Sequence, residues 1–332
     1  MKNCKFIILF MLWAFALPYM YGGCVVIYSS GDINNDKEQT DDQTTIGYTG
    51  STLQAKITPL NAESLAAGAF AGGQSSGGPK SLKLSRSSNA TRIELFRPLR
   101  VPLLLADSLR RIELGAALSI PSHTNLITES DNLDGRCGGE LSYTLTLNEI
   151  SGEFTGNFLF TDYCEDGIII SGETDVDGTF EVSSGVFDTA TFSFNDLSDE
   201  SHTLDGEISL DFTETPIVAT FTVYSKDKKS GQVYWLKDYS INLYELPGRV
   251  EIEIFGTFYN PDSGFVTLTT TEPFVVFDED DWPASGQLVI QGDSASHAQL
   301  IAMDQLHYRI EADTQGDGIF DLNSGILNWT DL

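Results

Sequence analysis

Apolar and polar residues alternate along most of the chain after Cys137, and this pattern is typical of strands with one buried face. The runs 141–147 and 250–254 are examples, in which apolar residues interleave with Ser and Thr or with glutamate. Turn-forming pairs such as Asp177-Gly178 recur between such runs. The pattern predicts a mainly β fold, an antiparallel meander of roughly a dozen strands that forms a barrel or a two-layer sandwich.

The part of the chain before Cys137 has a different pattern. Residues 48–57 are predicted as a strand, and a short helix capped by Asn61 is predicted to run to about Ala67. A longer helix is expected over 102–115, with Pro102 at its start. Asp107 and Arg111 are spaced to pair on one face of this helix. Its apolar face is formed by Leu105, Leu109, Ile112 and Ala116.

The first hairpin of the β region can be aligned residue by residue. A four-residue turn at 149–152 places Leu147 opposite Phe154, both on the apolar face. The same register brings Cys137 opposite Cys164, within reach of a disulfide. We therefore predict a structural disulfide, since the pair lacks the C-x-x-C spacing of redox-active cysteines.

The N-terminus is typical of an exported protein. A basic start is followed by the apolar run 6–17, which is too short to span a bilayer comfortably, and then by Gly22-Gly23-Cys24. Small residues before a cysteine predict lipidation of Cys24 after removal of a signal peptide, residues 1–23. Ordinary signal cleavage nearby, which would leave Cys24 as a free thiol, is the alternative.

These patterns divide the chain into four predicted parts. The signal peptide is followed by a polar, disordered tether at 24–47 and by an αβ segment at 48–136 that contains a flexible Gly/Ser-rich stretch. The antiparallel β domain then occupies 137–332.

The chain has 48 acidic and 19 basic residues, and the excess is concentrated from Cys137 onward, with 36 acidic against 6 basic. Such a surface repels nucleic acid and anionic lipid, so the sequence excludes nucleic-acid binding and favours cations or basic partners. An acidic surface that only keeps an exported β protein soluble is the simpler interpretation.

One acidic segment has the spacing of a calcium loop. From Asp313 the residues at odd positions are Gln315, Asp317, Ile319 and Asp321, and a glycine follows Asp317. In EF-hand-type loops the side chains at such positions, with a backbone carbonyl at the seventh (here Ile319), turn onto one Ca²⁺. No bidentate glutamate follows, so only weak calcium binding is expected. A hairpin turn in which Asp and Gly supply backbone geometry remains the alternative.

The lipobox-like start, the segment 48–55, the disulfide hairpin and the Asp/Gly-rich C-terminus together resemble β-rich bacterial lipoproteins of uncharacterised function. The resemblance implies a location in the cell envelope, facing the periplasm or the cell surface, and implies nothing about activity.

Three functional hypotheses follow. The first is a non-enzymatic lipoprotein of the outer membrane, a binding or structural module with an unknown envelope ligand or protein partner. The second is an envelope glycan hydrolase that uses two of the many carboxylates. The third is an integral outer-membrane barrel. The sequence carries no hydrolase, nucleotide-binding or zinc fingerprint.

Overall fold

The computed structural model describes residues 46–72, 97–112, 126–165, 167–213, 215–278 and 280–332. The predicted signal peptide, nearly all of the tether and the predicted lipidation site Cys24 lie outside these residues.

Two α-helices, two short 3₁₀-helices (Asp293–Ala295 and Trp329–Asp331) and fifteen strands make up the described part of the fold. The α-helices are α1 (Ala62–Phe70) and α2 (Arg97–Arg111). The strands are β1 (Leu126–Asp134), β2 (Gly138–Asn148), β3 (Glu153–Glu165), β4 (Ile168–Glu181), β5 (Val186–Ser198), β6 (His202–Asp211), β7 (Ile217–Asp227), β8 (Val233–Leu246), β9 (Arg249–Asn260), β10 (Gly264–Phe277), β11 (Ser285–Gln291), β12 (His297–Asp304), β13 (His307–Asp313), β14 (Leu322–Asn323) and β15 (Leu327–Asn328).

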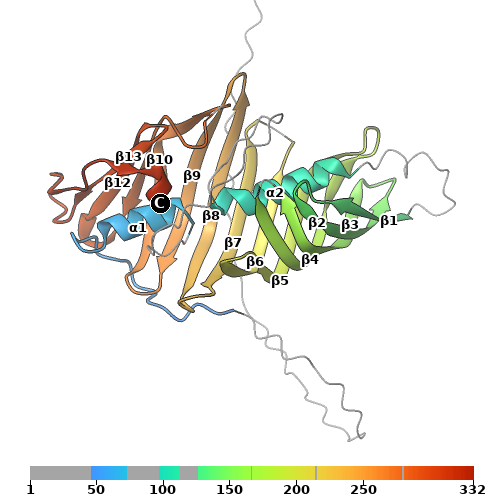
Figure 1. The fold of residues 1–332 in the computed structure, drawn as a ribbon, viewed down its shortest axis with the longest axis horizontal. Coiled ribbons are helices and arrows are strands. Elements are labelled where there is room, and N and C mark those ends of the chain that lie inside the picture. Colours follow the sequence, from blue (N-terminus) through green and yellow to red (C-terminus); the bar gives the residue numbers. More distant parts are fainter. Residues whose placement is uncertain (1–45, 73–96, 113–125, 166, 214, 279) are drawn as a thin grey trace, which may run out of the picture. The chain divides into compact units, whose positions relative to one another are not determined.

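All strands belong to one antiparallel meander (Figure 1). Each strand from β1 to β13 pairs with the next, and the short strands β14 and β15 both pair with β13. The path does not return to β1, so the sheet is not closed among the described strands. The predicted mainly β, antiparallel meander is confirmed, but its described strands form one open sheet in place of the predicted barrel or two-layer sandwich.

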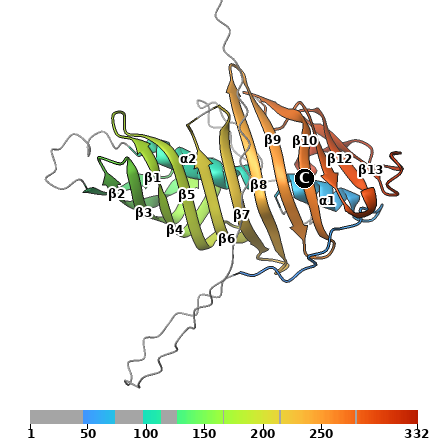
Figure 2. The ribbon, with the colours of Figure 1, turned by 180° about the vertical axis from the view of Figure 1, so that it is seen from behind.

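Both helices lie on the same face of the sheet, in front of the strands in Figure 1 and behind them in Figure 2. Helix α1 contacts β9 to β13, and α2 contacts β5 and β6. Leu65 of α1, Leu105 and Leu109 of α2 and the inward-facing strand residues form one buried apolar cluster. We call the helix-covered face the inner face and the opposite face the outer face.

The start of α1 differs in detail from the prediction. Asn61 precedes the helix, but its side chain makes no capping bond. Instead its Oδ1 accepts the N–H of Thr58 at 2.8 Å and closes the preceding turn. The helix also extends beyond the predicted end, to Phe70.

Helix α2 begins earlier than predicted, so Pro102 lies inside it. Proline cannot donate the usual helical hydrogen bond, and the buried apolar face of the helix offsets this loss. Leu105, Leu109 and Ile112 are buried as predicted. The helix ends at Arg111, before the predicted end at 115, and Ala116 lies outside the described residues.

The predicted hairpin register is confirmed, because Leu147 pairs with Phe154 across β2 and β3. Cys137 and Cys164 form a disulfide with their Cα atoms 5.1 Å apart. A bulge near Gly139 shifts the register here, so that Gly138 rather than Cys137 is directly opposite Cys164. Gly139 has φ +68°, and a Cβ there would lie 1.9 Å from the carbonyl oxygen of Asp162, so only glycine fits.

The strand predicted at 48–57 is not formed. This segment makes one isolated parallel bridge, between Gln54 and Phe265 of β10. Two backbone hydrogen bonds join it to β10, from the N–H of Ala55 to the Phe265 carbonyl at 2.8 Å and from the N–H of Phe265 to the Leu53 carbonyl at 2.9 Å.

Candidate functional site

The outer face of β4 carries three acidic side chains in a row. Glu173, Asp175 and Asp177 are exposed and alternate with the buried residues Thr174 and Val176. The alternation follows from the period of a strand, in which successive side chains point to opposite faces. Burying one face of the strand therefore exposes all three carboxylates on the other.

Neighbouring strands extend this acidic row. Asn157 of β3, Asp175 of β4, Ser193 of β5 and Glu207 of β6 are successive cross-strand partners. The Asn157 side-chain amide donates to Glu173 at 2.7 Å and reaches Asp175 at 3.5 Å. We call the outward-facing carboxylates of Glu173, Asp175, Asp177 and Glu207 the acidic strip.

No lysine or arginine occurs between residues 137 and 225, the segment that forms β2 to β6 and most of β7. The acidic strip therefore has no basic side chain on β2 to β6 to neutralise it, and the lysine of the adjacent strand β7, Lys226, lies opposite Thr203 and not opposite Glu207. Unpaired exposed carboxylates of one sign create a negative potential that attracts cationic groups.

An open hollow of about 470 Å³ lies beside the strip on β2, β3 and β4. Its lining is formed by Thr144, Thr146, Thr155, Gly156, Asn157, Asp175, Val176 and Asp177. Hydroxyl, amide and carboxylate groups are present among its lining residues, and no aromatic ring takes part in it. The hollow is therefore suited to hydrogen bonding and to positive charge, and it offers no stacking surface for a sugar ring.

A row of aromatic side chains crosses the outer face farther along the sheet. Tyr224, Trp235, Tyr259 and Phe265 are successive cross-strand partners on β7 to β10, with ring centroids 5.4, 4.4 and 5.2 Å apart. Tyr48 packs against Trp235 and Tyr259. The ring faces are directed at one another, so this row anchors the N-terminal segment and does not present a flat platform for a ligand.

The first described residue is tied to the same row. The Ile46 N–H donates to the carboxylate of Asp205 at 2.5 Å, and the Tyr48 hydroxyl donates to the Asn260 carbonyl at 2.9 Å. Asp205 is the cross-strand partner of Tyr224. The chain thus enters the fold across the outer face, over β6 to β9.

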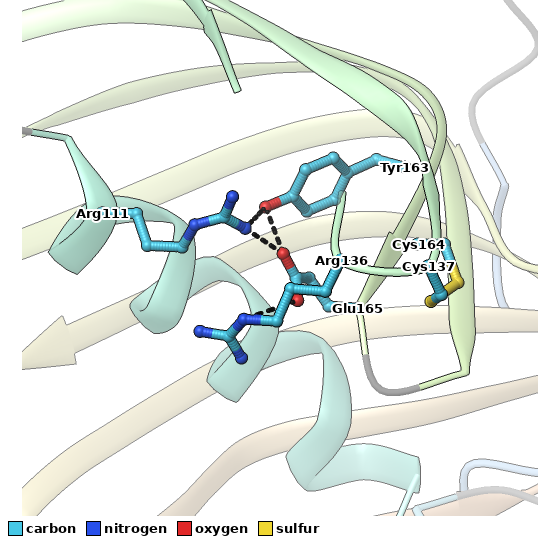
Figure 3. The surroundings of a disulfide bond; sticks show 6 residues. All are labelled: Arg111, Arg136, Cys137, Tyr163, Cys164 and Glu165. Carbon is cyan, nitrogen blue, oxygen red and sulfur yellow. Dashed lines mark hydrogen bonds and ion pairs between the residues drawn. A yellow bond between two sulfur atoms is a disulfide. The ribbon is translucent and has the colours of Figure 1, made fainter. Parts of the chain in front are cut away.

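A charged cluster lies beside the disulfide (Figure 3). Arg111, at the end of α2, donates to the hydroxyl of Tyr163 at 2.8 Å, to the carboxylate of Glu165 and to the carbonyl of Asp134 at 2.7 Å. Glu165 is 3% exposed. Burial raises the pKa of Tyr163 to about 12, so this phenol stays neutral and can donate to Glu165 at 2.9 Å.

The predicted pairing of Asp107 with Arg111 is wrong. Arg111 pairs with Glu165, and Asp107 pairs at 3.1 Å with Arg136, which also lies 3.6 Å from Glu165. A buried carboxylate requires counter-charges that an exposed one does not, and Glu165 forms ion pairs with both Arg111 and Arg136. These pairs tie α2 to the end of the sheet next to Cys137, which is a structural role.

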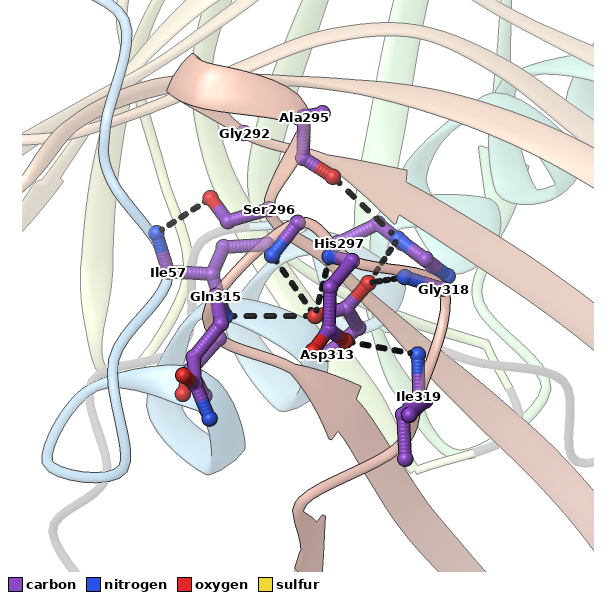
Figure 4. Close-up of polar contacts among 12 residues, drawn as sticks. Ile57, Gly292, Ala295, Ser296, His297, Asp313, Gln315, Gly318 and Ile319 are labelled. Atoms are coloured by element: carbon purple, nitrogen blue, oxygen red, sulfur yellow. Dashed lines mark hydrogen bonds and ion pairs between the residues drawn. The ribbon is translucent and has the colours of Figure 1, made fainter.

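The predicted calcium loop is organised around one buried carboxylate (Figure 4). Asp313, 1% exposed, accepts backbone N–H groups from Gln315 at 3.1 Å, Gly316 at 2.7 Å and Asp317 at 3.3 Å through Oδ1. Its Oδ2 accepts the N–H of Gly318 at 2.6 Å.

The other predicted ligands are also bonded within the loop. Asp317 accepts the N–H of Ile319 at 2.9 Å. Asp321 accepts the N–H and hydroxyl of Thr314 at 3.0 and 2.7 Å, and the side-chain nitrogen of Gln315 at 3.1 Å. Within the described chain, no group of three or more His, Cys, Asp or Glu side chains is placed to hold a metal ion. Calcium binding by this loop stays a prediction.

No helix among the described residues is long and apolar enough to cross a membrane. Comparisons with protein-family models, with curated proteins and with solved structures found no match to this chain.

Proposed function

We propose that this protein is a non-enzymatic module of the cell envelope that is anchored by a lipid on Cys24 and binds a positively charged partner through the acidic strip. Two separate features support the two parts of this proposal, the N-terminal sequence and the outer face of the sheet.

The observation that carries the proposal is the difference between the two faces of the sheet. The inner face is occupied by α1, α2 and the apolar cluster. The outer face of β3 to β6 instead presents the acidic strip and many hydroxyls, with no lysine or arginine in these strands. A solvated face needs polarity for solubility, but it does not need charge of one sign. A broad surface of one sign fits a partner of the opposite sign.

The anchor is supported by the sequence alone. The apolar run 6–17 and the Gly22-Gly23-Cys24 sequence resemble the signal peptide and lipobox of an exported lipoprotein. Mass spectrometry of the protein extracted from membranes should find a lipid-modified N-terminus at Cys24, and Cys24→Ser should move the protein to the soluble fraction. A soluble wild-type protein that begins at another residue would overturn the anchor.

Binding is tested with the intact protein and two probes of opposite charge, an oligolysine and an oligoglutamate peptide. We expect binding of the lysine peptide only, with an affinity that falls as salt is raised, because exposed charges are screened by salt. Equal affinity for the two peptides, or affinity independent of salt, would contradict the proposal.

A further inference from the structure

Strand β1 forms one end of the sheet (Figure 1). It pairs with β2 over its full length, from Leu126 to Asp134, and no described strand pairs with its other side. The opposite end differs, because the short strands β14 and β15 pair with β13 there. An edge strand directs backbone N–H and C=O groups away from the sheet at alternate residues, and these groups can pair with an added strand.

The inner-face side chains of β1 have an unusual order. Ile127 and Leu133 are partly buried and pack against the apolar cluster. Between them lie Glu129 and Asp131, on the same face, and no lysine or arginine among the described residues forms an ion pair with either carboxylate. The edge thus presents the order apolar, acidic, acidic, apolar at alternate positions.

These two carboxylates lie in a place where a counter-charge would be favourable. Burial, and then the charge of Asp131, raises the pKa of Glu129. Burial, and then the charges of Glu129 and Asp131, raises the pKa of the neighbouring Tyr143. A cationic side chain placed beside β1 would relieve this repulsion.

A second copy of the chain does not supply that charge. If two β1 strands paired antiparallel about Ser130, Glu129 of each copy would face Asp131 of the other, and like charges directly opposite one another are destabilising. Inward-facing charges of this kind protect an edge from self-association. The same charges leave the edge open to a basic strand.

We propose that β1 accepts an added strand from a partner, with lysine or arginine at two alternate positions and an apolar residue on either side. Backbone hydrogen bonds along the edge supply affinity, and the pairing of basic side chains with Glu129 and Asp131 supplies selectivity. This site is separate from the acidic strip and does not depend on its function.

The test uses the intact protein and two peptides, Thr-Val-Thr-Lys-Thr-Lys-Thr-Val-Thr and the same sequence with Glu in place of Lys. The sequence reads the same in both directions, so it presents its two charges to β1 in either orientation. We expect the wild-type protein to bind the lysine peptide at least about tenfold more tightly than the glutamate peptide. The double variant Glu129→Lys, Asp131→Lys should reverse this preference.

Two further variants locate the effect. Thr128→Lys with Ser130→Lys places charges at the same spacing on the other face of β1 and should keep the preference for the lysine peptide. The triple variant Glu173→Lys, Asp175→Lys, Asp177→Lys should also keep this preference. Equal affinity of the wild-type protein for both peptides, or an unchanged preference in Glu129→Lys, Asp131→Lys, would overturn the proposal.

Discussion

Aspartate has two roles in this protein, and residue type alone does not separate them. Asp313 and Asp321 turn onto backbone N–H groups of their own loop, where they fix its shape. Asp175 and Asp177 point to solvent from the outer face of β4. The first kind stabilises the fold and the second kind is available to a partner.

The carboxylates of the C-terminal loop predict how stability changes in acid. The backbone N–H of Thr314, then its hydroxyl and the amide of Gln315, lower the pKa of Asp321 to about 2. In the unfolded chain the value is near 4, so this stabilisation is complete above pH ~4 and is lost as the pH falls toward ~2. Asp321→Asn should therefore lower the free energy of unfolding at pH 6 and have little effect at pH 2. Denaturant unfolding at the two pH values measures this, and a deficit equal at both would contradict it.

Calcium binding by the same loop is a separate prediction. If Asp313, Asp317 and Asp321 can turn onto a cation, calorimetric titration should give heat at millimolar Ca²⁺, the affinity range of extracellular sites. Asp317→Ala should abolish that heat. Equal heats from the two proteins would leave the hairpin turn as the function of the loop.

Side-chain partners could be predicted only where the backbone pattern determines them. The alternation of the two strands and the turn between them predict that Leu147 lies opposite Phe154, and the structure confirms this pairing. Arg111 instead pairs with Glu165, far away in the sequence. Helix spacing showed only that Asp107 was within reach, and it gave no sign that Glu165 would be buried. The acidic strip did have a sequence signal, the acids at 173, 175 and 177 in a strand without basic residues.

At the scale of elements, the meander was predictable because each strand carries its own alternation and many turns have typical turn residues. The pair Asp177-Gly178 is an exception, since it lies within β4 and not in a turn. The position of the helices was not, since nothing local shows which face of the sheet a helix will cover. The segment 48–57 is predicted as a strand, yet it forms a single bridge, at Phe265, just before the stretch of β10 that pairs with β11 from Thr267 onward. Proline is typical of the first turn of a helix, but α2 begins five residues before Pro102, at Arg97, and the buried apolar face of the helix offsets the missing hydrogen bond.

The disulfide should contribute to stability through the loop that it closes. Cys137 and Cys164 are separated by 27 residues, and on the chain-entropy model closing such a loop stabilises the fold by about 3–4 kcal/mol. The double variant Cys137→Ala, Cys164→Ala should lose this amount in denaturant unfolding. Thiol labelling of the folded wild-type protein should modify neither residue, and labelling of either would contradict the structure.

The attachment of α2 depends on Arg111 more than on its neighbour in the sequence. Arg111→Met leaves Glu165 buried with only Arg136 nearby, and we expect a loss of about 2–3 kcal/mol in the free energy of unfolding. Arg110→Met is the matched control. Arg110 is exposed, with its nitrogen 3.9 Å from Glu245, and should cost less than about 1 kcal/mol. Similar losses in the two variants would show that the Glu165 cluster does not hold the helix.

The described part of the molecule is a single sheet whose inner face is covered by helices and whose outer face is exposed over much of its area. Helices and apolar side chains occupy the inner face, so the fold depends on that side. The outer face is charged, receives the N-terminal segment across β6 to β9, and contains the acidic strip on β4 and β6. The location of the strip is therefore the central claim of the functional account.

That claim is tested most directly by reversing the charge of the strip and comparing it with an equal change elsewhere. The triple variant Glu173→Lys, Asp175→Lys, Asp177→Lys is measured beside Asp278→Lys, Asp280→Lys, Asp281→Lys, which makes the same change between β10 and β11. Affinity for an oligolysine peptide should fall at least about tenfold in the first variant and less than about twofold in the second. Equal weakening in both would show that only net charge attracts the peptide, and no weakening in the first would show that the strip does not bind it.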